Sequence, residues 1–190
     1  MMQWLIDIDK KLFTFLNGSA TASWLDAVAP WYRDSQTWIP LYVFLLLFVF
    51  INGKFKGVYW LIFIVACAGL TDQVSSQLLK KTVMRLRPCA DPTMADTIRL
   101  LMPHCSGGYS FTSSHATNHF GAAAFVFITL KKYFQNWAYL FWFWAASISY
   151  LQTYVGVHYP LDVLVGALLG AAIGTGMAKL YQNQMKEQVV

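Results

Sequence analysis

Long apolar runs recur along this sequence, and they restrict the chain to a fold that a lipid bilayer can hold. Residues 38–52 and 57–79 form the first two runs, and residues 114–130, 137–154 and 160–181 form three more. A helix of about 20 apolar residues spans a bilayer and satisfies its own backbone hydrogen bonds. Charged residues make up only 12% of the chain, about half of the roughly 25% typical of soluble domains. We therefore expect an all-α, polytopic membrane helix bundle of about five transmembrane helices.

The N-terminal region, residues 1–36, has a different pattern. Its apolar residues recur at helical spacing, at Trp4, Leu5, Ile8, Leu12, Phe13 and Leu16, whereas Asp7, Asp9, Lys10 and Lys11 lie elsewhere on the same helix. This pattern favours an amphipathic helix in the membrane interface. The region lacks the charge order and the cleavage site of a secretory signal. Without an internal repeat, residues 1–190 are expected to form a single membrane-embedded domain.

The positive charges fall into two groups. One group lies in short turns or at the end of a run, where positive charge orients a membrane protein: Lys54, Lys56, Lys131, Lys132, Lys179 and Lys186. The other group crowds the segment between the second and third runs: Lys80, Lys81, Arg85, Arg87 and Arg99. If the first group is cytoplasmic, residues 80–113 and 155–159 share the opposite face. The net charge of +5 does not indicate a nucleic-acid partner, because no soluble basic face exists.

A candidate anion site lies where the second run ends. Lys80 and Arg87 are seven residues apart, so we expect both on one face of a helix that Pro88 ends. Two cations at a membrane boundary suit a phosphate, because Arg offers a planar fork and Lys a point charge. The alternative is a cluster of interfacial side chains whose charges reach water, and Lys81 and Arg85 are better explained in this way.

The third run begins with Thr112-Ser113-Ser114-His115. Hydroxyl side chains cap helices, and the free N–H groups of a helix N-terminus bind anions, so His115 would lie beside a bound anion. A structural role at the start of the helix is the alternative. His119 follows at a spacing that zinc ligands use, but no third ligand has a recognised metal spacing, so we expect no metal.

The last polar motif is His158-Tyr159-Pro160-Leu161-Asp162. Pro160 suits the first position of a helix, which places Asp162 in the first turn, where the helix dipole favours a carboxylate. Asp162 can reach back to His158, fix its tautomer and stabilise the charge that develops when the other ring nitrogen attacks. The alternative is an exposed histidine beside an aspartate that only caps the helix.

Together these motifs resemble the type-2 phosphatidic acid phosphatases, which include bacterial lipid phosphatases and undecaprenyl pyrophosphate phosphatases. That family carries a Lys, six residues and Arg-Pro; then Pro-Ser-Gly-His; and then Ser-Arg, five residues, His, three residues and Asp. The residues that match are Lys80, Arg87 and Pro88; Ser113 and His115; and His158 and Asp162. The residues that depart from the pattern are Thr112, Ser114, Leu151 and Gln152. The resemblance covers residues 80–162, with flanking runs of matching character.

The resemblance implies a metal-independent and cofactor-free lipid phosphatase. His158 would attack phosphorus to give a phosphohistidine, Asp162 would orient it, and His115 would protonate the departing oxygen. Phosphate oxygens would be held by Lys80, Arg87, Ser113, Gln152 and the backbone near Ser114. The expected partners are a lipid phosphate substrate and membrane lipids. The expected place is a bacterial-type inner membrane, with the active site on the periplasmic face.

Gln152 is the departure that bears most on activity, because it stands where the family has a phosphate-binding Arg. A neutral amide binds phosphate more weakly than a guanidinium, so catalysis is expected to be slower or differently tuned. Two alternatives remain open: a lipid phosphotransferase on the same fold, and a weakly active or non-catalytic lipid-phosphate binding protein. The retained His158, Asp162 and His115 argue against mere binding.

Three further predictions concern the cysteines, Asp72 and the lipid tail. Cys89 and Cys105 lie in one loop rich in glycine and proline, where a disulfide is plausible at an oxidising face, and Cys67 is expected to be a packed thiol. Asp72 must face the interior of the bundle, either as a partner of polar groups or in support of the cationic site. A hydrophobic cleft between the third, fourth and fifth runs would admit the lipid tail.

Overall fold

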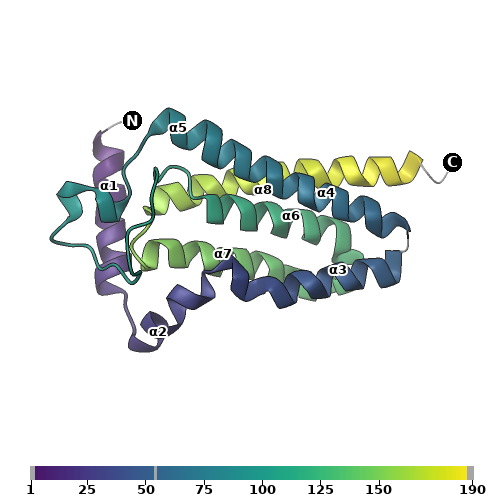
Figure 1. The fold of residues 1–190 in the computed structure, drawn as a ribbon, viewed down its shortest axis with the longest axis horizontal. Helices are drawn as coiled ribbons and strands as arrows, with labels where there is room; N and C mark the ends of the chain where they lie inside the picture. Colours follow the sequence, from purple (N-terminus) through teal and green to yellow (C-terminus); the bar gives the residue numbers. More distant parts are fainter. Residues whose placement is uncertain (1–2, 54, 188–190) are drawn as a thin grey trace.

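Five long helices run side by side along the molecule in this computed structural model, which describes residues 3–53 and 55–187 (Figure 1). They are α3 (Ile39–Gly53), α4 (Phe55–Asp72), α6 (Ser114–Phe134), α7 (Tyr139–Tyr154) and α8 (Pro160–Glu187). No strand occurs within the described ranges, and the expected all-helical fold is confirmed. Three helical stretches, which contain α3, α4 and α8, are long and apolar enough to cross a membrane. The count of five spans stays a prediction.

Glycines allow α6 and α8 to pack closely. A Cβ atom on Gly170 would lie 2.1 Å from the Thr117 carbonyl oxygen, and one on Gly174 would lie 2.1 Å from that of Gly121. Small residues let helices approach in this way inside membranes. The largest group of buried apolar side chains, which includes Phe125, joins these helices to α3, α4 and α7. The close contact also brings the first turn of α6 beside the first turn of α8.

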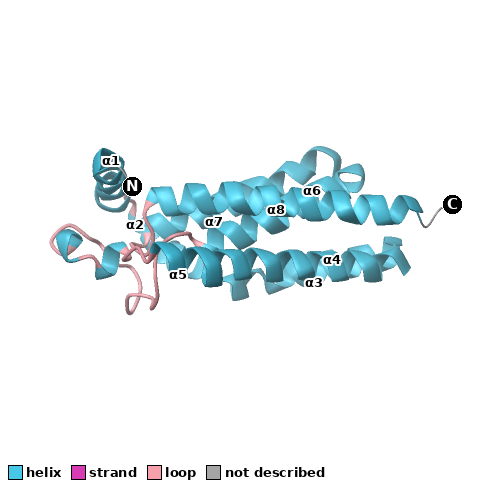
Figure 2. Ribbon diagram, turned by 90° about the horizontal axis from the view of Figure 1, so that it is seen from above, coloured by secondary structure: helices cyan, strands magenta, loops and turns pink. Residues whose placement is uncertain are grey.

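The N-terminal segment covers one end of this bundle. Helix α1 (Gln3–Thr14) lies across the long helices, as Figures 1 and 2 show together, and α2 (Ser23–Tyr32) leads through a short turn, Ser35–Trp38, into α3. Trp4, Ile8 and Leu12 are exposed on α1, as expected, whereas Phe13 is buried against Tyr159. Asp9 is also buried, at 5% exposure, because it contacts the start of α8.

The second long helix ends earlier than Pro88. After α4 it continues through a π-helical segment, Gln73–Leu79, and a last turn, α5 (Lys80–Val83). Met84 then adopts a left-handed conformation, φ 48°, which is a common way for a helix to end. The prediction that Pro88 ends the helix is therefore wrong. Arg87 does not share a helix face with Lys80, because its backbone is extended and the 3₁₀ turn Pro88–Ala90 follows it.

The loop from Met84 to Ser113 and the turn between α7 and α8 lie at the end covered by α1, whereas the last turn of α3, the first turn of α4 and the C-terminal end of α8 lie at the other (Figure 1). Lys54 falls outside the described residues. Cys89 and Cys105 form a disulfide with their Cα atoms 5.6 Å apart, as expected. Cys67 is fully buried, which confirms its assignment as a packed thiol.

Candidate active site

His158 lies in the tight turn between α7 and α8 and is only 2% exposed. The backbone carbonyl of Gln152 accepts the N–H groups of both Val157 and His158, at 3.1 and 3.2 Å. Gly156 closes the turn with φ 92°, and a Cβ atom there would lie 2.8 Å from the Arg99 carbonyl oxygen. Only glycine suits this backbone and this close approach. The last turn of α7 therefore holds the backbone of His158 in a fixed position.

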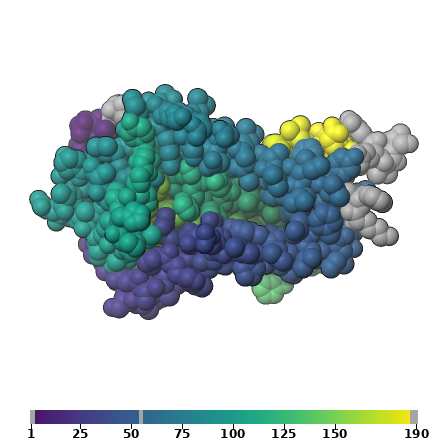
Figure 3. All heavy atoms as spheres, in the orientation of Figure 1, coloured from purple at the N-terminus to yellow at the C-terminus, as the bar shows by residue number. Residues whose placement is uncertain are grey.

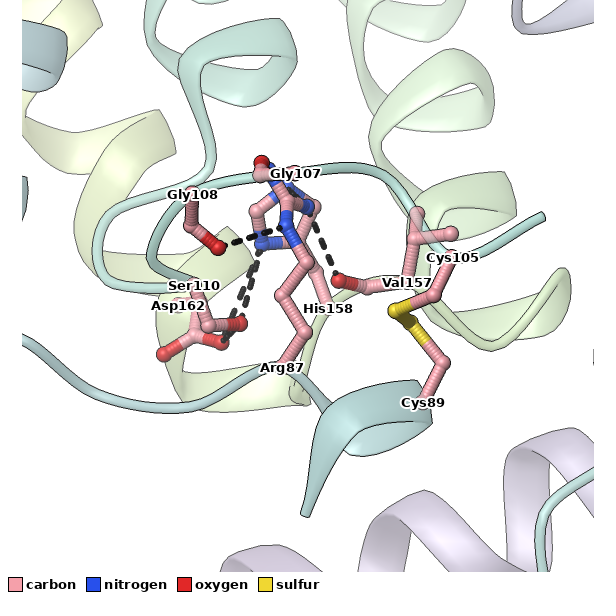
Figure 4. The surroundings of a disulfide bond; sticks show 9 residues. All are labelled: Arg87, Cys89, Cys105, Gly107, Gly108, Ser110, Val157, His158 and Asp162. Carbon is pink, nitrogen blue, oxygen red and sulfur yellow. Dashed lines mark hydrogen bonds and ion pairs between the residues drawn. A yellow bond between two sulfur atoms is a disulfide. The ribbon is translucent and has the colours of Figure 1, made fainter.

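Figure 4 shows the two ring nitrogens of His158 in different surroundings. Nε2 lies 2.9 Å from Nη1 of Arg87, whereas Nδ1 lies 3.3 Å from Oγ of Ser110 and 3.8 Å from Oδ2 of Asp162. A guanidinium can only donate, so Nε2 is the acceptor and the ring proton belongs on Nδ1. The free electron pair of His158 thus points toward a cation and away from the carboxylate.

Asp162 is fully buried in the first turn of α8. Its Oδ2 accepts hydrogen bonds from Ser110 Oγ and from the Tyr159 N–H group, the latter at 3.0 Å. Ser110 thus bridges the carboxylate and the His158 ring, and the structure brings the predicted pair together. The sequence analysis missed Ser110, because nothing in its neighbourhood distinguishes it from the other serines of the loop.

Arg85 is bound to the same carboxylate, so its assignment to a solvent-seeking interfacial cluster is wrong. Its Nη1 lies 2.8 Å from Asp162, its Nη2 lies 2.6 Å from Asp9, and the guanidinium lies 4.0 Å from the Tyr159 ring centroid. The second oxygen of Asp9 accepts the Leu161 N–H group at 2.8 Å. The sequence analysis also missed Asp9, which lies 153 residues before Asp162 and reaches it only through the fold.

Arg87 spans the gap between the loop and His158. Besides Nε2 of His158, it binds the carbonyl oxygen of Val157 at 3.1 Å and those of Gly107 and Gly108 at 3.3 Å (Figure 4). Its guanidinium is held by neutral carbonyls, and no carboxylate among the described residues lies within 4.0 Å of it. Lys80, half-buried on α5, interacts electrostatically with Arg87 and Asp162. Of the predicted cation pair, Arg87 therefore contacts the histidine, whereas Lys80 acts on it electrostatically and comes from a different local structure.

The start of α6 also joins the site. Ser113 caps the helix by accepting the Ala116 N–H group at 3.4 Å, and its own N–H group donates to the Asp162 carbonyl oxygen at 3.0 Å. Ser114 Oγ lies 2.9 Å from Ser75 Oγ and 3.1 Å from Ser76 Oγ. Free N–H groups of the first turn of α6 remain available to an anion.

Asp72 and His119 take part in polar contacts within the bundle. Asp72 accepts a hydrogen bond from Ser76 at 3.1 Å, so it acts as a partner of polar groups and connects through Ser76 to Ser114. His119 donates from Nδ1 to the His115 carbonyl oxygen at 2.7 Å, and its ring packs on Trp144. The described residues contain no group of three His, Cys, Asp or Glu side chains placed to hold a metal ion.

The buried position of His158 sets its protonation state. Burial lowers the pKa of His158 to about 4; the Asp162 carboxylate opposes this shift and the Arg87 charge adds to it. Because desolvation disfavours a charged imidazole, His158 is neutral at pH 7. A neutral ring with Nε2 unprotonated has the form that a nucleophile requires.

A cavity of about 680 Å³ opens beside the polar residues. Its polar end contains Asp72, Ser114 and His115, and its apolar wall includes Leu45, Trp60, Ile64, Val126 and Phe141. Figure 3 shows a hollow at this place, where atoms of α6 and α7 are visible between α3 and α4. The lining comes from α3, α4, α6 and α7, and none of the described residues of α8 belongs to it. The expected cleft between the third, fourth and fifth helices is therefore corrected to this position.

Gln152 is fully buried, and the protein itself uses its amide. Its Oε1 accepts hydrogen bonds from Nε and Nη2 of Arg33 at 3.1 and 2.8 Å, and its Nε2 donates to the Ile148 carbonyl oxygen at 3.2 Å. The sequence analysis missed Arg33, which follows α2 outside every recognised motif. The sequence contained one indication of it: Gln152 stands where the family has an arginine, so another residue could supply that positive charge.

This membrane helix bundle holds a buried, neutral histidine beside fixed cations and one carboxylate. Such a site is typical of an integral membrane enzyme that acts on phosphate groups. The chain belongs to the PAP2 superfamily, whose family model matches residues 57–186. PAP2 enzymes are hydrolases, and the matched residues include every block of the site except the N-terminal segment.

Curated relatives and solved structures agree with this family. The chain is 32% identical to a lipid A 4'-phosphatase of Bacteroides thetaiotaomicron over 90% of this chain and 75% of that protein. It is 31% identical to an undecaprenyl-diphosphatase of Sulfolobus acidocaldarius over 95% of this chain and 86% of that protein. The crystal structure of Aquifex aeolicus LpxE is similar with a TM-score of 0.64 and 26% identity, covering 90% of this chain and 95% of that one. A PAP2-type phosphatidylglycerolphosphate phosphatase of Bacillus subtilis shares the fold with a TM-score of 0.71 and 19% identity, covering 96% and 88%.

Proposed function

We propose that this protein is a membrane lipid phosphatase that hydrolyses a phosphomonoester or pyrophosphate of a lipid through a phosphohistidine, without a metal ion. The observation that supports this most is the arrangement at His158. Its Nε2 accepts from Arg87 at 2.9 Å, while Ser110 and Asp162 lie on the Nδ1 side. Arg87 would move from the ring to the phosphate when substrate binds, which frees Nε2 for attack.

The first chemical step forms one bond and breaks one. Nε2 of His158 attacks phosphorus, the bond from phosphorus to the leaving oxygen breaks, and its electron pair stays on that oxygen. His115, which must be protonated on both ring nitrogens for this step, donates a proton to the departing oxygen and becomes neutral. Asp162, held by Ser110 and Arg85, stabilises the positive charge that develops on the His158 ring. This step leaves a phosphohistidine and a released lipid alcohol or lipid phosphate.

The second step returns the enzyme to its starting state. A water molecule attacks the phosphohistidine, its proton passes to His115, and the P–N bond breaks to release inorganic phosphate. Lys80, Arg87 and the N–H groups at the start of α6 would hold the phosphate oxygens throughout. Fixed cations supply the charge stabilisation that divalent metals supply in other phosphoryl transfers.

The cavity explains how a lipid could present its phosphate to this site. The apolar wall would take an acyl or isoprenoid chain, and the phosphate would lie at the polar end, near Ser114 and His115. The relatives act on lipid A and on undecaprenyl diphosphate by their names, and we propose a substrate of this amphiphilic class here.

The site is proposed to face the periplasm, or the outer side of a cytoplasmic membrane. The disulfide between Cys89 and Cys105 lies near His158 (Figure 4) and suits an oxidising compartment. Lys131, Lys132 and Lys186 belong to helix ends on the opposite side, where positive residues mark the cytoplasm. In this orientation α3, α4, α6, α7 and α8 all span the bilayer, and α1 lies in the interface.

The proposed function is tested with purified protein and a panel of lipid phosphates in detergent. We expect inorganic phosphate to be released from at least one long-chain lipid phosphate and its release to require His158. A second lipid alcohol added to the assay separates hydrolysis from transfer, because a phosphotransferase would convert it to a new lipid phosphate. Specific binding of the panel lipids with no turnover would contradict the proposal.

A further inference from the structure

Arg33 occupies a position that only the folded chain brings next to the catalytic turn. It follows α2 directly, it lies 119 residues before Gln152, and it donates two hydrogen bonds to the Gln152 amide oxygen. The backbone carbonyl of the same Gln152 accepts the His158 N–H group. One residue therefore connects the Arg33 guanidinium to the nucleophile.

Arg33 is also a buried cation that forms no ion pair with a carboxylate of the described residues. It is 7% exposed, and its Nη1 donates a hydrogen bond to the Met102 sulfur at 3.4 Å. Arg85 and Arg99 each contact a carboxylate, whereas no described carboxylate lies within 4.0 Å of Arg33. The neighbouring Asp34 instead accepts the Gln36 N–H group. A buried charge without a counter-ion is costly, so such a site favours binding of an anion.

The charge of Arg33 also acts on the guanidinium of Arg87, the other buried arginine that no carboxylate among the described residues contacts. Burial lowers the pKa of Arg33, and the negative charge of Asp34 opposes this shift. Burial also lowers the pKa of Arg87, and the positive charge of Arg33 lowers it further against the opposing effect of Asp162. The positive charges of Arg33 and Arg87 therefore repel each other. A dianion bound between them would relieve this repulsion.

We propose that Arg33 is a phosphate-binding residue that replaces, from the N-terminal segment, the arginine that PAP2 sequences carry at position 152. Gln152 is then a positioning residue, whose amide oxygen holds the Arg33 fork in place. The ligand is the phosphate dianion of the lipid substrate, so this inference rests on the proposed function. It changes the expectation for Gln152, since the charge lost at that position is supplied by a different helix.

The reciprocal exchange of the two side chains tests this assignment. Arg33→Gln is expected to lower kcat/KM roughly 10- to 100-fold, the scale of one charge-assisted phosphate contact. The double variant Arg33→Gln/Gln152→Arg returns the guanidinium from the other side and is expected to recover most of the lost activity. Gln152→Arg alone is expected to lower activity, because two guanidiniums then compete for one place. Lys81→Gln is the matched control, because Lys81 is an exposed cation next to the site.

A binding measurement separates this inference from the proposed function. Orthovanadate is expected to raise the melting temperature of the wild type and of the double variant, and to raise that of Arg33→Gln much less. This readout does not require turnover, so it applies even if no lipid on the panel is hydrolysed. A vanadate response in Arg33→Gln equal to that of the wild type would overturn the proposal.

A purely structural role for Arg33 would give a different result. Arg33→Gln would then melt at a lower temperature, while kcat/KM per folded molecule and the vanadate response would stay unchanged. Should Arg33→Gln fail to fold, Arg33→Lys keeps the charge and loses the fork, and we expect it to fold and to bind vanadate more weakly. Full activity in Arg33→Lys together with no rescue in the double variant would also overturn the proposal.

Discussion

Asp9 of α1 and Asp162 of α8 bind the same guanidinium, that of Arg85, at 2.6 and 2.8 Å. The N-terminal helix is thereby tied to the carboxylate that faces His158. The side chains of Arg85, Asp9 and Asp162 are 13%, 4% and 0% exposed. Their interactions are weakly screened by solvent, and Asp9 accepts hydrogen bonds from both Arg85 and the Leu161 N–H group.

Asp9→Asn tests this connection. The variant weakens the Asp9 hydrogen bond to Arg85, which stays paired with Asp162, and is expected to lower the free energy of unfolding by about 1–2 kcal/mol, with a smaller decrease in kcat. Thermal unfolding in detergent and steady-state assays measure the two effects. Asp7→Asn is the matched control, because Asp7 is exposed on the same helix and accepts a hydrogen bond from Gln3, one turn away. Equal stability of the two variants would show that the Asp9 contact does not stabilise the fold.

Asp162→Asn is expected to leave the protein folded and to lower kcat by roughly 10³-fold or more. The amide keeps the size of the carboxylate but cannot stabilise the charge that forms on His158, as in other histidine–aspartate pairs. The rate of phosphate release and the melting temperature are compared with those of the wild type. Near-normal kcat in a folded variant would remove Asp162 from this role.

The low pKa of His158 predicts a dependence of stability on pH. The folded pKa of about 4 lies below the ordinary value of about 6.5, so the unfolded chain binds more protons between these values. The contribution of neutral His158 to the free energy of unfolding is fully present above pH 6.5. It decreases by about 3 kcal/mol as the pH falls toward 4. Unfolding followed from pH 4 to 7 should show this slope in the wild type and a shallower one in His158→Gln. Identical slopes in the wild type and His158→Gln would contradict the low pKa of His158. His104→Gln serves as the control, because His104 is exposed.

Ala122→Trp tests whether the cavity receives the lipid tail. Ala122 lines the apolar part of the cavity, and an indole there would fill space that a chain needs. We expect KM for a long-chain lipid phosphate to rise about tenfold, while hydrolysis of a short, water-soluble phosphate ester stays the same. If both substrates are affected equally, the cavity is not the tail site.

The five long helices could be predicted from the sequence because hydropathy is local information. Each apolar run carries its own signal, and the described helices begin and end within a few residues of the predicted limits. The match of Lys80, Arg87, Ser113, His115, His158 and Asp162 to one family could likewise be recognised from spacing alone. Two cysteines in one loop made a disulfide plausible, and the structure contains it.

The residues that complete the site could not be predicted in this way, because they depend on tertiary contacts. Asp9 and Arg33 lie in an N-terminal segment whose amphipathic pattern indicates only an interfacial helix. Arg85 lies between two helix ends, and its direction depends on the left-handed turn at Met84, a residue type that rarely adopts it. The assumption of a regular helix through Arg87 therefore placed Arg85 on the wrong side.

The most direct test of the account measures the phosphohistidine itself. The purified protein, with excess EDTA, is mixed with a ³²P-labelled lipid phosphate, quenched within milliseconds and separated from lipid. The account predicts a protein-bound phosphate that is stable in base and lost in acid. It should form in the wild type, form more slowly in Asp162→Asn than in the wild type, and be absent from His158→Ala. Phosphate release that requires a metal ion, or that persists in a folded His158→Ala variant, would contradict it.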